Sequence, residues 1–300
     1  MKSNRQLALY AFTLIALGSS CTREEILTNL EVSKDCEVRY AAEKRIKKIT
    51  STYSSTGTVR VWEFSYLKNA VKNINTTRNG IASGNYVIQY ASGICIPSGY
   101  NFLWNSDVEY DLNGIFTIDK TRITRRTMTP NYRNPFTVDS SNSNVFNYDG
   151  TGRINSDVPG FADAPLYDNV INITYTATGN VQNMHRIGGS QEVITTNTMD
   201  SRKNPFKQQD KLLYYMKILP MQTFNKSEES VFHYFSLNNN NPLRFQYIDP
   251  GINQFEFTFE YTYTLDGFPL TMRIYKAAYT SDPVTPDPRV LMEELAFEYF

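Results

Sequence analysis

The segment FEFTFEYTY, residues 255–263, alternates aromatic and polar side chains without a break. Every odd-numbered residue is Phe or Tyr, and every even-numbered residue is Glu or Thr. Successive side chains of a β-strand point to opposite faces of the sheet, so the pattern predicts a strand with one apolar and one hydrated face. Because each aromatic ring can bury about 150–250 Å², we expect the aromatic face to lie in a core or to line a barrel. A platform for sugar rings is the alternative.

A second pattern recurs along the chain: a tyrosine, three mostly polar residues and a glycine. The copies are YSSTG at 53–57, YDLNG at 110–114, YDGTG at 148–152, YTATG at 175–179 and YTLDG at 263–267, with YLKNA at 66–70 as a copy that lacks the glycine. Asp, Asn, Ser and Thr favour turns, and glycine supplies the positive φ that closes a short hairpin loop. Each copy is therefore predicted to be a hairpin turn whose tyrosine ends the incoming strand.

The rest of the chain supports the same fold class. Short alternating runs lie between turn signals, and helical periodicity is confined to 210–216 and 24–29. Asn-, Ser- and Pro-rich stretches at 129–144, 238–241 and 281–288 indicate loops that interrupt the sheet. With 41% hydrophobic residues, 21 Tyr and 18 Phe, the core can be large. We predict an all-β fold, an antiparallel hairpin-repeat sheet that is strongly curled or barrel-like, with at most one or two short helices.

The N-terminus carries a targeting signal. Lys2 and Arg5 precede an apolar run at 7–17, followed by small residues and Cys21. The run is shorter than the roughly 20 residues that span a bilayer, but it fits a signal peptide over 1–20. The segment resembles a bacterial lipobox, although Gly18 stands where leucine is usual. In a lipobox the cysteine is acylated and becomes the new N-terminus. An ordinary signal peptide with an incidental cysteine is the alternative.

Several segments resemble known families. TREE at 22–25 is similar to the surface-export signal of Bacteroidota lipoproteins, and the Tyr-Asp pairs of YDLNG and YDGTG resemble the YD repeats of Rhs proteins. RKNPF at 202–206, NNNNPLRF at 238–245 and EYTYTLDGFPLTMRI at 260–274 resemble Bacteroidota lipoproteins with YD-repeat-like β-hairpins. This resemblance covers most of residues 40–300. It implies an anchored β domain at the cell surface or in the periplasm, and offers no catalytic residues to carry over.

These signals divide the chain into a signal peptide (1–20), a lipid-anchored tether (21–40) and one antiparallel β domain (41–300). The expected location is the outer membrane, held by lipid on Cys21 and exposed at the cell surface, with the periplasm as the alternative. A membrane-spanning barrel is a further alternative, because the chain alternates and ends on an aromatic residue. The lipid anchor and the short, irregular strands favour a sheet that does not span the bilayer.

Few residues qualify as functional sites. Trp62 and Trp104 are the only tryptophans and are candidates for stacking on a ligand, with burial in the core as the alternative. Cys36 and Cys95 can form a disulfide in an oxidising compartment or remain two buried thiols. His185 and His233 lack a recognisable catalytic partner. We expect no metal and no cofactor, because two His and the cysteine spacing match no metal-binding motif.

The sequence predicts the function only in general terms. Lys+Arg and Asp+Glu both total 30, so charge balance gives no indication of nucleic-acid binding. No catalytic motif is present in the sequence. We predict a binding or structural role, in which a β-hairpin scaffold presents loops to a glycan or a partner protein. The alternatives are an envelope hydrolase acting on glycans through two carboxylates, and a ligand-free subunit of an outer-membrane complex.

Overall fold

The computed structural model of the chain describes residues 36, 39, 44–91, 95–104, 110–132, 142–161, 164–165, 170–187, 193–218, 220–222, 235–249, 253–279 and 286–300. Cys21, His233 and nearly all of the predicted tether lie outside the described residues.

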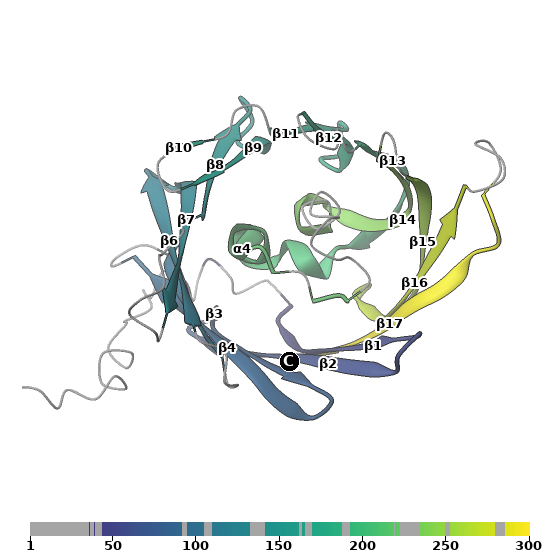
Figure 1. Cartoon of the computed structure of the whole chain (residues 1–300), viewed down its shortest axis with the longest axis horizontal. Coiled ribbons are helices and arrows are strands. Elements are labelled where there is room, and N and C mark those ends of the chain that lie inside the picture. The colour runs from purple at the N-terminus through teal and green to yellow at the C-terminus, as the bar shows by residue number, and fades with distance from the viewer. Residues whose placement is uncertain are drawn as a thin grey trace, which may run out of the picture.

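The chain forms one closed antiparallel barrel (Figure 1). Sixteen strands each pair with the next around the ring, and β17 pairs with β1 to close it. The predicted all-β, barrel-like fold class is confirmed. The strands are β1 (Ile46–Tyr53), β2 (Thr58–Leu67), β3 (Ala70–Arg78), β4 (Ile81–Tyr90), β5 (Pro97–Trp104), β6 (Tyr110–Asp119), β7 (Arg122–Tyr132), β8 (Asn142–Tyr148), β9 (Ile154–Phe161), β11 (Ile171–Tyr175), β12 (Val181–Arg186), β13 (Val193–Lys203), β14 (Asn240–Asp249), β15 (Asn253–Tyr263), β16 (Pro269–Ala278) and β17 (Val290–Tyr299). A further two-residue strand, β10 (Ala164–Pro165), pairs only with β9.

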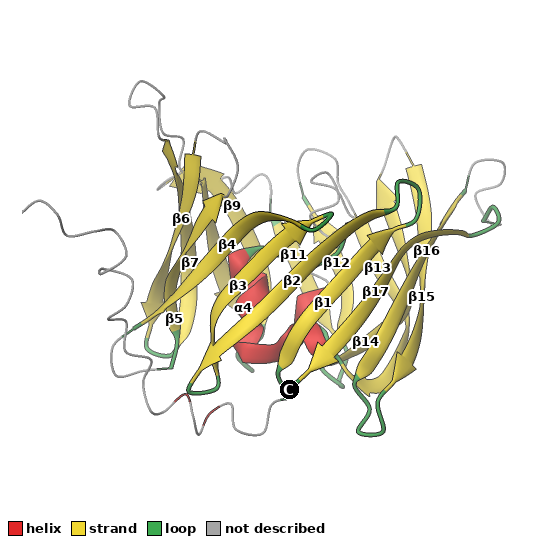
Figure 2. Cartoon of the chain, turned by 90° about the horizontal axis from the view of Figure 1, so that it is seen from below, coloured by secondary structure: helices red, strands yellow, loops and turns green. Residues whose placement is uncertain are grey.

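The two ends of the barrel differ. One end, which we call the short-turn end, contains the start of β1, the C-terminal end of β17 and the tight turns that join β2 to β3, β6 to β7 and β8 to β9 (Figure 2). Most of the connections at the opposite end include residues outside the described ranges. The predicted loop at 129–144 is shorter than expected, because β7 continues to Tyr132 and β8 begins at Asn142.

Most of the predicted hairpin turns are present. Gly152, Gly179 and Gly267 have φ between 79° and 84° in turns at the short-turn end, and Gly57 has φ 64° in a turn at the opposite end. In YLKNA, Lys68 and Asn69 both adopt positive φ and replace the glycine. The prediction for YDLNG is wrong, because Gly114 lies inside β6. Any Cβ at Gly114 would overlap the ring of Tyr100 on the neighbouring strand, so this glycine serves packing instead of a turn.

The barrel encloses a plug, which we define as the described residues between 204 and 222 (all except 219) together with 235–239. It contains the 3₁₀ helix η1 (Pro205–Lys207) and the helix α4 (Gln208–Met216), seen inside the ring in Figure 1. The helix predicted at 210–216 is therefore confirmed. Plug and wall share one hydrophobic core in which aromatic rings meet edge to face: Tyr215 with Phe146 and Phe116, Phe206 with Phe297, and Phe235 with Phe259.

The segment FEFTFEYTY, residues 255–263, shows how this interior is built. Phe257 and Phe259 of β15 are buried inside the barrel, at 0% and 3% exposure, as the aromatic alternation predicted. The intervening Glu256, Thr258 and Glu260 face outward. The aromatic face thus supplies core, because plug side chains such as Phe235 are available to cover it.

The outer wall carries many charged and polar side chains, and apolar residues such as Ile115 of β6 are also exposed on it. Ion pairs join outward side chains of neighbouring strands, as in Arg273–Glu294 at 2.6 Å, Arg244–Glu256 and Lys48–Glu298 at 3.3 Å. Outward positions elsewhere on the wall include Asn73 and Asn75 of β3. Within the described ranges, no helix has the length and apolar character required to cross a bilayer.

A repeated tyrosine contact ties the strands together at the short-turn end. The hydroxyl of Tyr66, which lies near the end of β2, donates to the carbonyl of Ile46 at the start of β1 (2.8 Å). Tyr175 donates to Ile154 in the same way at 2.7 Å. Equivalent bonds run from Tyr90 to Val71, Tyr148 to Ile123, Tyr261 to Pro242 and Tyr299 to Pro269. We call these contacts the tyrosine latches.

An arginine precedes the accepting isoleucine in three of the latches, and each arginine stacks on the donating ring. The guanidinium carbons of Arg45, Arg122 and Arg153 lie 5.7, 5.3 and 4.7 Å from the ring centroids of Tyr66, Tyr148 and Tyr175. The repeat unit is therefore an Arg-Ile pair at the start of one strand and a tyrosine at or near the end of a later strand.

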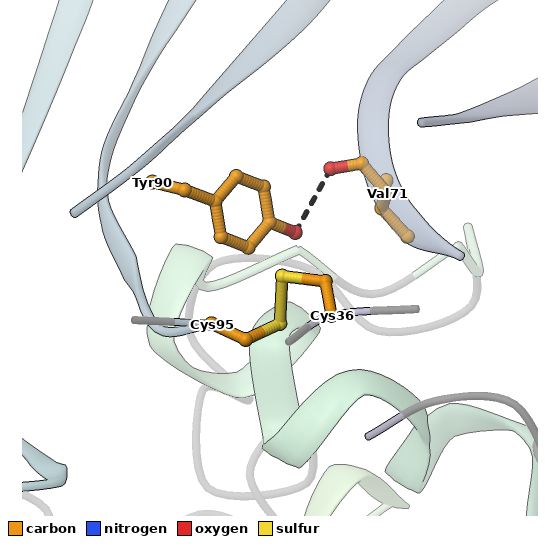
Figure 3. Close-up of a disulfide and its surroundings, with 4 residues drawn as sticks. All are labelled: Cys36, Val71, Tyr90 and Cys95. Atoms are coloured by element: carbon orange, nitrogen blue, oxygen red, sulfur yellow. Dashed lines mark hydrogen bonds between the residues drawn. A yellow bond between two sulfur atoms is a disulfide. The ribbon is translucent and has the colours of Figure 1, made fainter. Parts of the chain in front are cut away.

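Cys36 and Cys95 form a disulfide with an S–S distance of 2.07 Å (Figure 3). This is the pairing that the sequence left open. Cys95 lies between β4 and β5 at the short-turn end, beside the Tyr90 latch. The bond therefore attaches the segment preceding β1 to the barrel at this end.

Candidate functional site

A cavity of about 540 Å³ opens between the plug and the turns of the short-turn end. Its walls come from segments far apart in the sequence. They include Ile96 before β5, Ile123 of β7, Tyr215 of α4 and Phe268 before β16. Because the barrel brings turns from widely separated hairpins to one rim, this mouth can be lined by residues that no local motif would connect.

The lining is strongly basic. Six cationic side chains border the cavity, and no acidic side chain does so within the described residues: Arg39, Lys44, Arg122, Lys203, Lys207 and Lys211. Lys44 also pairs with Asp266, which lies outside the lining, at 2.6 Å. That ion pair holds the pKa of Asp266 at about 2. Like charges gathered in one cavity repel one another, so the arrangement favours an anionic occupant.

Aromatic rings help to hold these cations in place. The ammonium groups of Lys44 and Lys203 lie 5.5 and 5.6 Å from the ring centroid of Phe268. Arg122 stacks on Tyr148, which also lines the cavity. Cation–π contacts of this kind fix the direction of a charged side chain while leaving its hydrogen-bond donors available to a ligand.

Two of the lysines stand where a helix disfavours positive charge. Lys207 is the N-cap residue of α4 and has no side-chain cap there, and Lys211 lies one turn further on. The N-terminus of a helix carries partial positive charge, which repels lysine. Burial lowers the pKa of Lys207, and its ammonium contacts the side-chain oxygen of Asn239. Lys211 has φ 68°, a left-handed conformation that costs an L-residue about 1–2 kcal/mol.

An asparagine cluster holds the plug against the wall beside the cavity. The side-chain amide of Asn204 donates to the carbonyls of Phe235 and Asn238, and its oxygen accepts from the amide of Phe206 at 2.9 Å. Asn180 accepts from the backbone amides of Asn239 and Asn240 at 2.9 and 3.0 Å. The motifs RKNPF and NNNNPLRF therefore meet in space, where they position Lys203 and Lys207 at the rim.

A buried polar network fixes the other end of α4. Asp157 of β9 is fully buried and accepts from Asn144 at 2.7 Å and from the hydroxyl of Tyr214 at 3.0 Å. The ammonium of Lys217 pairs with the same carboxylate, and Arg126 donates to Asn144 at 2.8 Å. Burial raises the pKa of Tyr214 well above its usual value. Because Asp157 and Lys217 compensate each other's charge and join β9 to the end of α4, we interpret the network as an anchor for the plug.

A second buried carboxylate anchors the plug segment that follows α4. Glu293 of β17 is fully buried and accepts from the hydroxyl of Ser51 and from the backbone amide of Gln222 at 2.7 Å. The side-chain amide of Gln222 donates to Ser51 Oγ at 2.7 Å. The end of α4 and the plug segment after it are thus tied to different strands, β9 and β17.

The two tryptophans lie inside the barrel. Trp62 is only 6% exposed and belongs to the core. Trp104 packs edge to face on Phe102 with ring centroids 4.7 Å apart, and its indole nitrogen is buried. Neither belongs to the lining of the basic cavity. The structure places His185 on β12, paired with Asn172 of β11 and Val193 of β13.

A second hollow lies on the outer wall over β15, β16, β17 and β1, and two carboxylates line it. Glu260 accepts from Tyr275 at 3.0 Å and from Arg289 at 2.7 Å, whereas Glu294 pairs with Arg273. The hydrogen bond from Tyr275, followed by that from Arg289, lowers the pKa of Glu260. A general acid requires a raised pKa, so the geometry does not favour acid–base hydrolysis in this hollow.

Sequence reasoning missed the basic cavity. A local signal existed in Lys203, Lys207 and Lys211, which are spaced four residues apart across RKNPF and α4. Their clustering is hidden by the overall balance of 30 basic and 30 acidic residues. Arg39 and Arg122 lie far away in sequence, and only barrel closure brings them to the same rim. The described residues contain no group of three or more His, Cys, Asp or Glu that could hold a metal ion.

Comparison with known proteins gives structural neighbours only. No protein-family profile and no curated protein sequence matches the chain. A porin-like protein from Bacteroides uniformis superposes with a TM-score of 0.54 at 9% identity, over 85% of this chain and 98% of that one. A porin-like protein from Bacteroides vulgatus gives a TM-score of 0.48 at 10% identity, over 86% and 99% of the two chains. The first of these likenesses shows that the chain shares its barrel fold with a porin-like protein.

Proposed function

We propose that this chain is a cell-envelope lipoprotein, anchored through an acylated Cys21, whose barrel is a rigid binding scaffold in the aqueous phase. The single observation that carries the proposal is the distribution of polar and apolar side chains, which is the reverse of that in a membrane pore. Its outer wall bears ion pairs such as Arg273–Glu294, and its interior holds an apolar core shared with a plug. Membrane pores place apolar residues outside and polar residues inside.

The likeness to porin-like structures supports an envelope location, as do the signal peptide and lipobox predicted from the sequence. It does not carry over a channel activity to this chain. The plug lies inside the ring and is held there by Asp157 and Glu293 on opposite sides. The ligand binds at the rim of the barrel, where the loops can vary in sequence while the strands keep their positions. A glycan or a partner protein is the proposed ligand of this scaffold, and the cell surface is its proposed location.

Membrane extraction tests the proposal. The native protein and the Cys21→Ala variant would be expressed in a bacterium that processes lipoproteins, and membranes would be washed with alkaline carbonate. We expect the native protein to stay with the membrane and the variant to be released as a folded barrel. Thr22→Ala, which leaves the cysteine intact, serves as the matched control and should behave like the native protein.

Two results would overturn the proposal. If Cys21→Ala resisted the carbonate wash, the barrel itself would be inserted in the bilayer. If the purified barrel produced stable conductance steps in a planar bilayer, the scaffold interpretation would fail in favour of a channel.

A further inference from the structure

We infer that the basic cavity at the short-turn end binds a phosphate-bearing anion of the size of a phosphorylated sugar or lipid headgroup. The inference deepens the proposed binding function by naming the chemical class of the ligand and the part of the rim that takes it. It rests on the charge, size and placement of the cavity.

Charge is the first argument. Six cationic side chains and no described acidic side chain line the cavity, although the whole chain is balanced at 30 basic and 30 acidic residues. Arginine can bind a phosphate through two parallel hydrogen bonds, and lysine is a common point-charge partner of phosphate. Arg39 and Arg122 supply the first kind of donor, while Lys203, Lys207 and Lys211 supply the second.

The second argument is that two of the cavity lysines occupy energetically unfavourable positions. Lys207 and Lys211 stand at the N-terminal end of α4, and the backbone of Lys211 is left-handed at φ 68°. Unfavourable backbone conformations of this kind concentrate at ligand sites. An anion in the cavity would neutralise the lysines and also interact favourably with the helix N-terminus.

Size and lining form the third argument. A volume of about 540 Å³ exceeds what a single inorganic phosphate fills and falls within the range of small-molecule sites. Apolar and aromatic side chains, among them Ile96, Tyr148 and Phe268, share the lining with the cations. The mixture suits a phosphate joined to a sugar or glycerol unit.

The position of the cavity permits contact with a membrane. The disulfide at Cys36 attaches the N-terminal segment to the short-turn end, and Arg39 and Cys95 line the cavity. Cys36 lies fifteen positions after Cys21 in the sequence. An extended chain of that length reaches at most about 50 Å, so a lipid on Cys21 would keep this end of the barrel near the bilayer. The phosphate can come from a lipid headgroup or from a free phosphorylated saccharide.

The test uses the Cys21→Ala protein in solution, so that membrane anchoring and pocket binding are measured separately. Isothermal titration with glucose 6-phosphate would be compared with titration of glucose. Co-sedimentation with phosphatidylglycerol vesicles would be compared with phosphatidylcholine vesicles. We expect binding to at least one of the two phosphate-bearing probes and none to its matched neutral or zwitterionic control, and affinity should fall as salt screens the charges.

The variant Lys207→Gln/Lys211→Gln should weaken that binding at least tenfold. Lys48→Gln/Arg273→Gln removes the same charge from the outer wall and should leave binding unchanged. Lys203→Gln, at an exposed position of the rim, provides a second test that does not touch the plug helix. Circular dichroism would check that each variant is folded.

The two binding assays distinguish the two possible sources of the phosphate. Binding of glucose 6-phosphate identifies a soluble phosphorylated saccharide, and binding only to phosphatidylglycerol vesicles identifies a lipid headgroup. The inference is overturned if neither probe binds, if glucose binds as well as its phosphate, or if the outer-wall variant loses as much affinity as the cavity variant. A negative result here leaves the anchoring experiment unaffected, because that experiment reads membrane extraction alone.

Discussion

At the scale of single residues, the barrel depends on polar groups whose partners are distant in sequence. Asp157 compensates Lys217 across sixty residues, and Tyr175 reaches the carbonyl of Ile154 across twenty-one. Such contacts cannot be recognised from spacing, because each depends on which strands become neighbours. The repeated tyrosines can be recognised in the sequence, but the backbone carbonyl groups that accept hydrogen bonds from their hydroxyls cannot.

The Asp157 network should be costly to disturb. Replacing Asp157 with Asn removes the charge that compensates the mostly buried ammonium of Lys217. Loss of one member of a buried ion pair costs about 3–5 kcal/mol, and we expect a decrease of that order in the free energy of unfolding measured with urea. Glu298→Gln is the control, because its ion pairs with Lys47 and Lys48 are exposed and should cost less than about 1 kcal/mol. Equal losses in the two variants would refute the anchoring role.

The tyrosine latches should each contribute through the hydroxyl group. Tyr175→Phe keeps the ring under Arg153 but removes the donor to Ile154. A lost hydrogen bond of this kind lowers the free energy of unfolding by about 1 kcal/mol, as measured in denaturant titrations. Tyr53→Phe, at the opposite end of the barrel, serves as the control and should stay within about 0.5 kcal/mol of the native protein. The latch interpretation fails if the two variants are equally stable.

At the scale of elements, the alternation in FEFTFEYTY was the most reliable signal. Strand β15 extends over that segment, with Phe257 and Phe259 in the core and Glu260 on the outer wall. Turn chemistry was nearly as informative, since four of the five glycine-bearing copies are turns with positive φ. The exception, Gly114, shows the limit of such a pattern: a glycine also fits where a neighbouring ring leaves no room for a Cβ.

The two faces of β15 should respond differently to truncation. Phe257→Ala would leave a cavity in the shared core beside Phe245 and should cost about 3–5 kcal/mol of unfolding free energy. Thr262→Ala on the outer face removes only an exposed hydroxyl contact with Thr271 and should cost less than about 0.5 kcal/mol. Thermal and urea denaturation of both variants would measure the difference. A comparable loss in each would show that the outer face is also packed against something.

At the scale of the whole molecule, closure of the ring and the disulfide decide which residues meet at the short-turn end. The bond between Cys36 and Cys95 spans 59 residues and encloses strands β1 to β4. It also lies beside Arg39 and the basic cavity. Its formation therefore links the segment that leads to Cys21 with the proposed ligand site.

Removal of the disulfide should destabilise the barrel measurably. For a loop of this length the chain-entropy account gives about 4 kcal/mol, and measured values are commonly about 2–4 kcal/mol. We expect Cys36→Ser/Cys95→Ser to lower the urea midpoint accordingly while retaining the β-sheet circular dichroism spectrum. The same decrease should follow reduction of the native protein by dithiothreitol, and dithiothreitol should leave the double variant unchanged. An unchanged midpoint in the double variant would contradict this role.

The sequence by itself determined the fold class, the strand character of residues 255–263, most turns at the short-turn end and the short helix α4. These features depend on side-chain periodicity and on local φ preferences, which neighbouring residues carry. Only the tertiary structure decided how many strands close the ring, that the plug lies inside it, and that six cations share one cavity. Those features depend on contacts between residues 60 or more positions apart, whose geometry is fixed only when β17 pairs with β1.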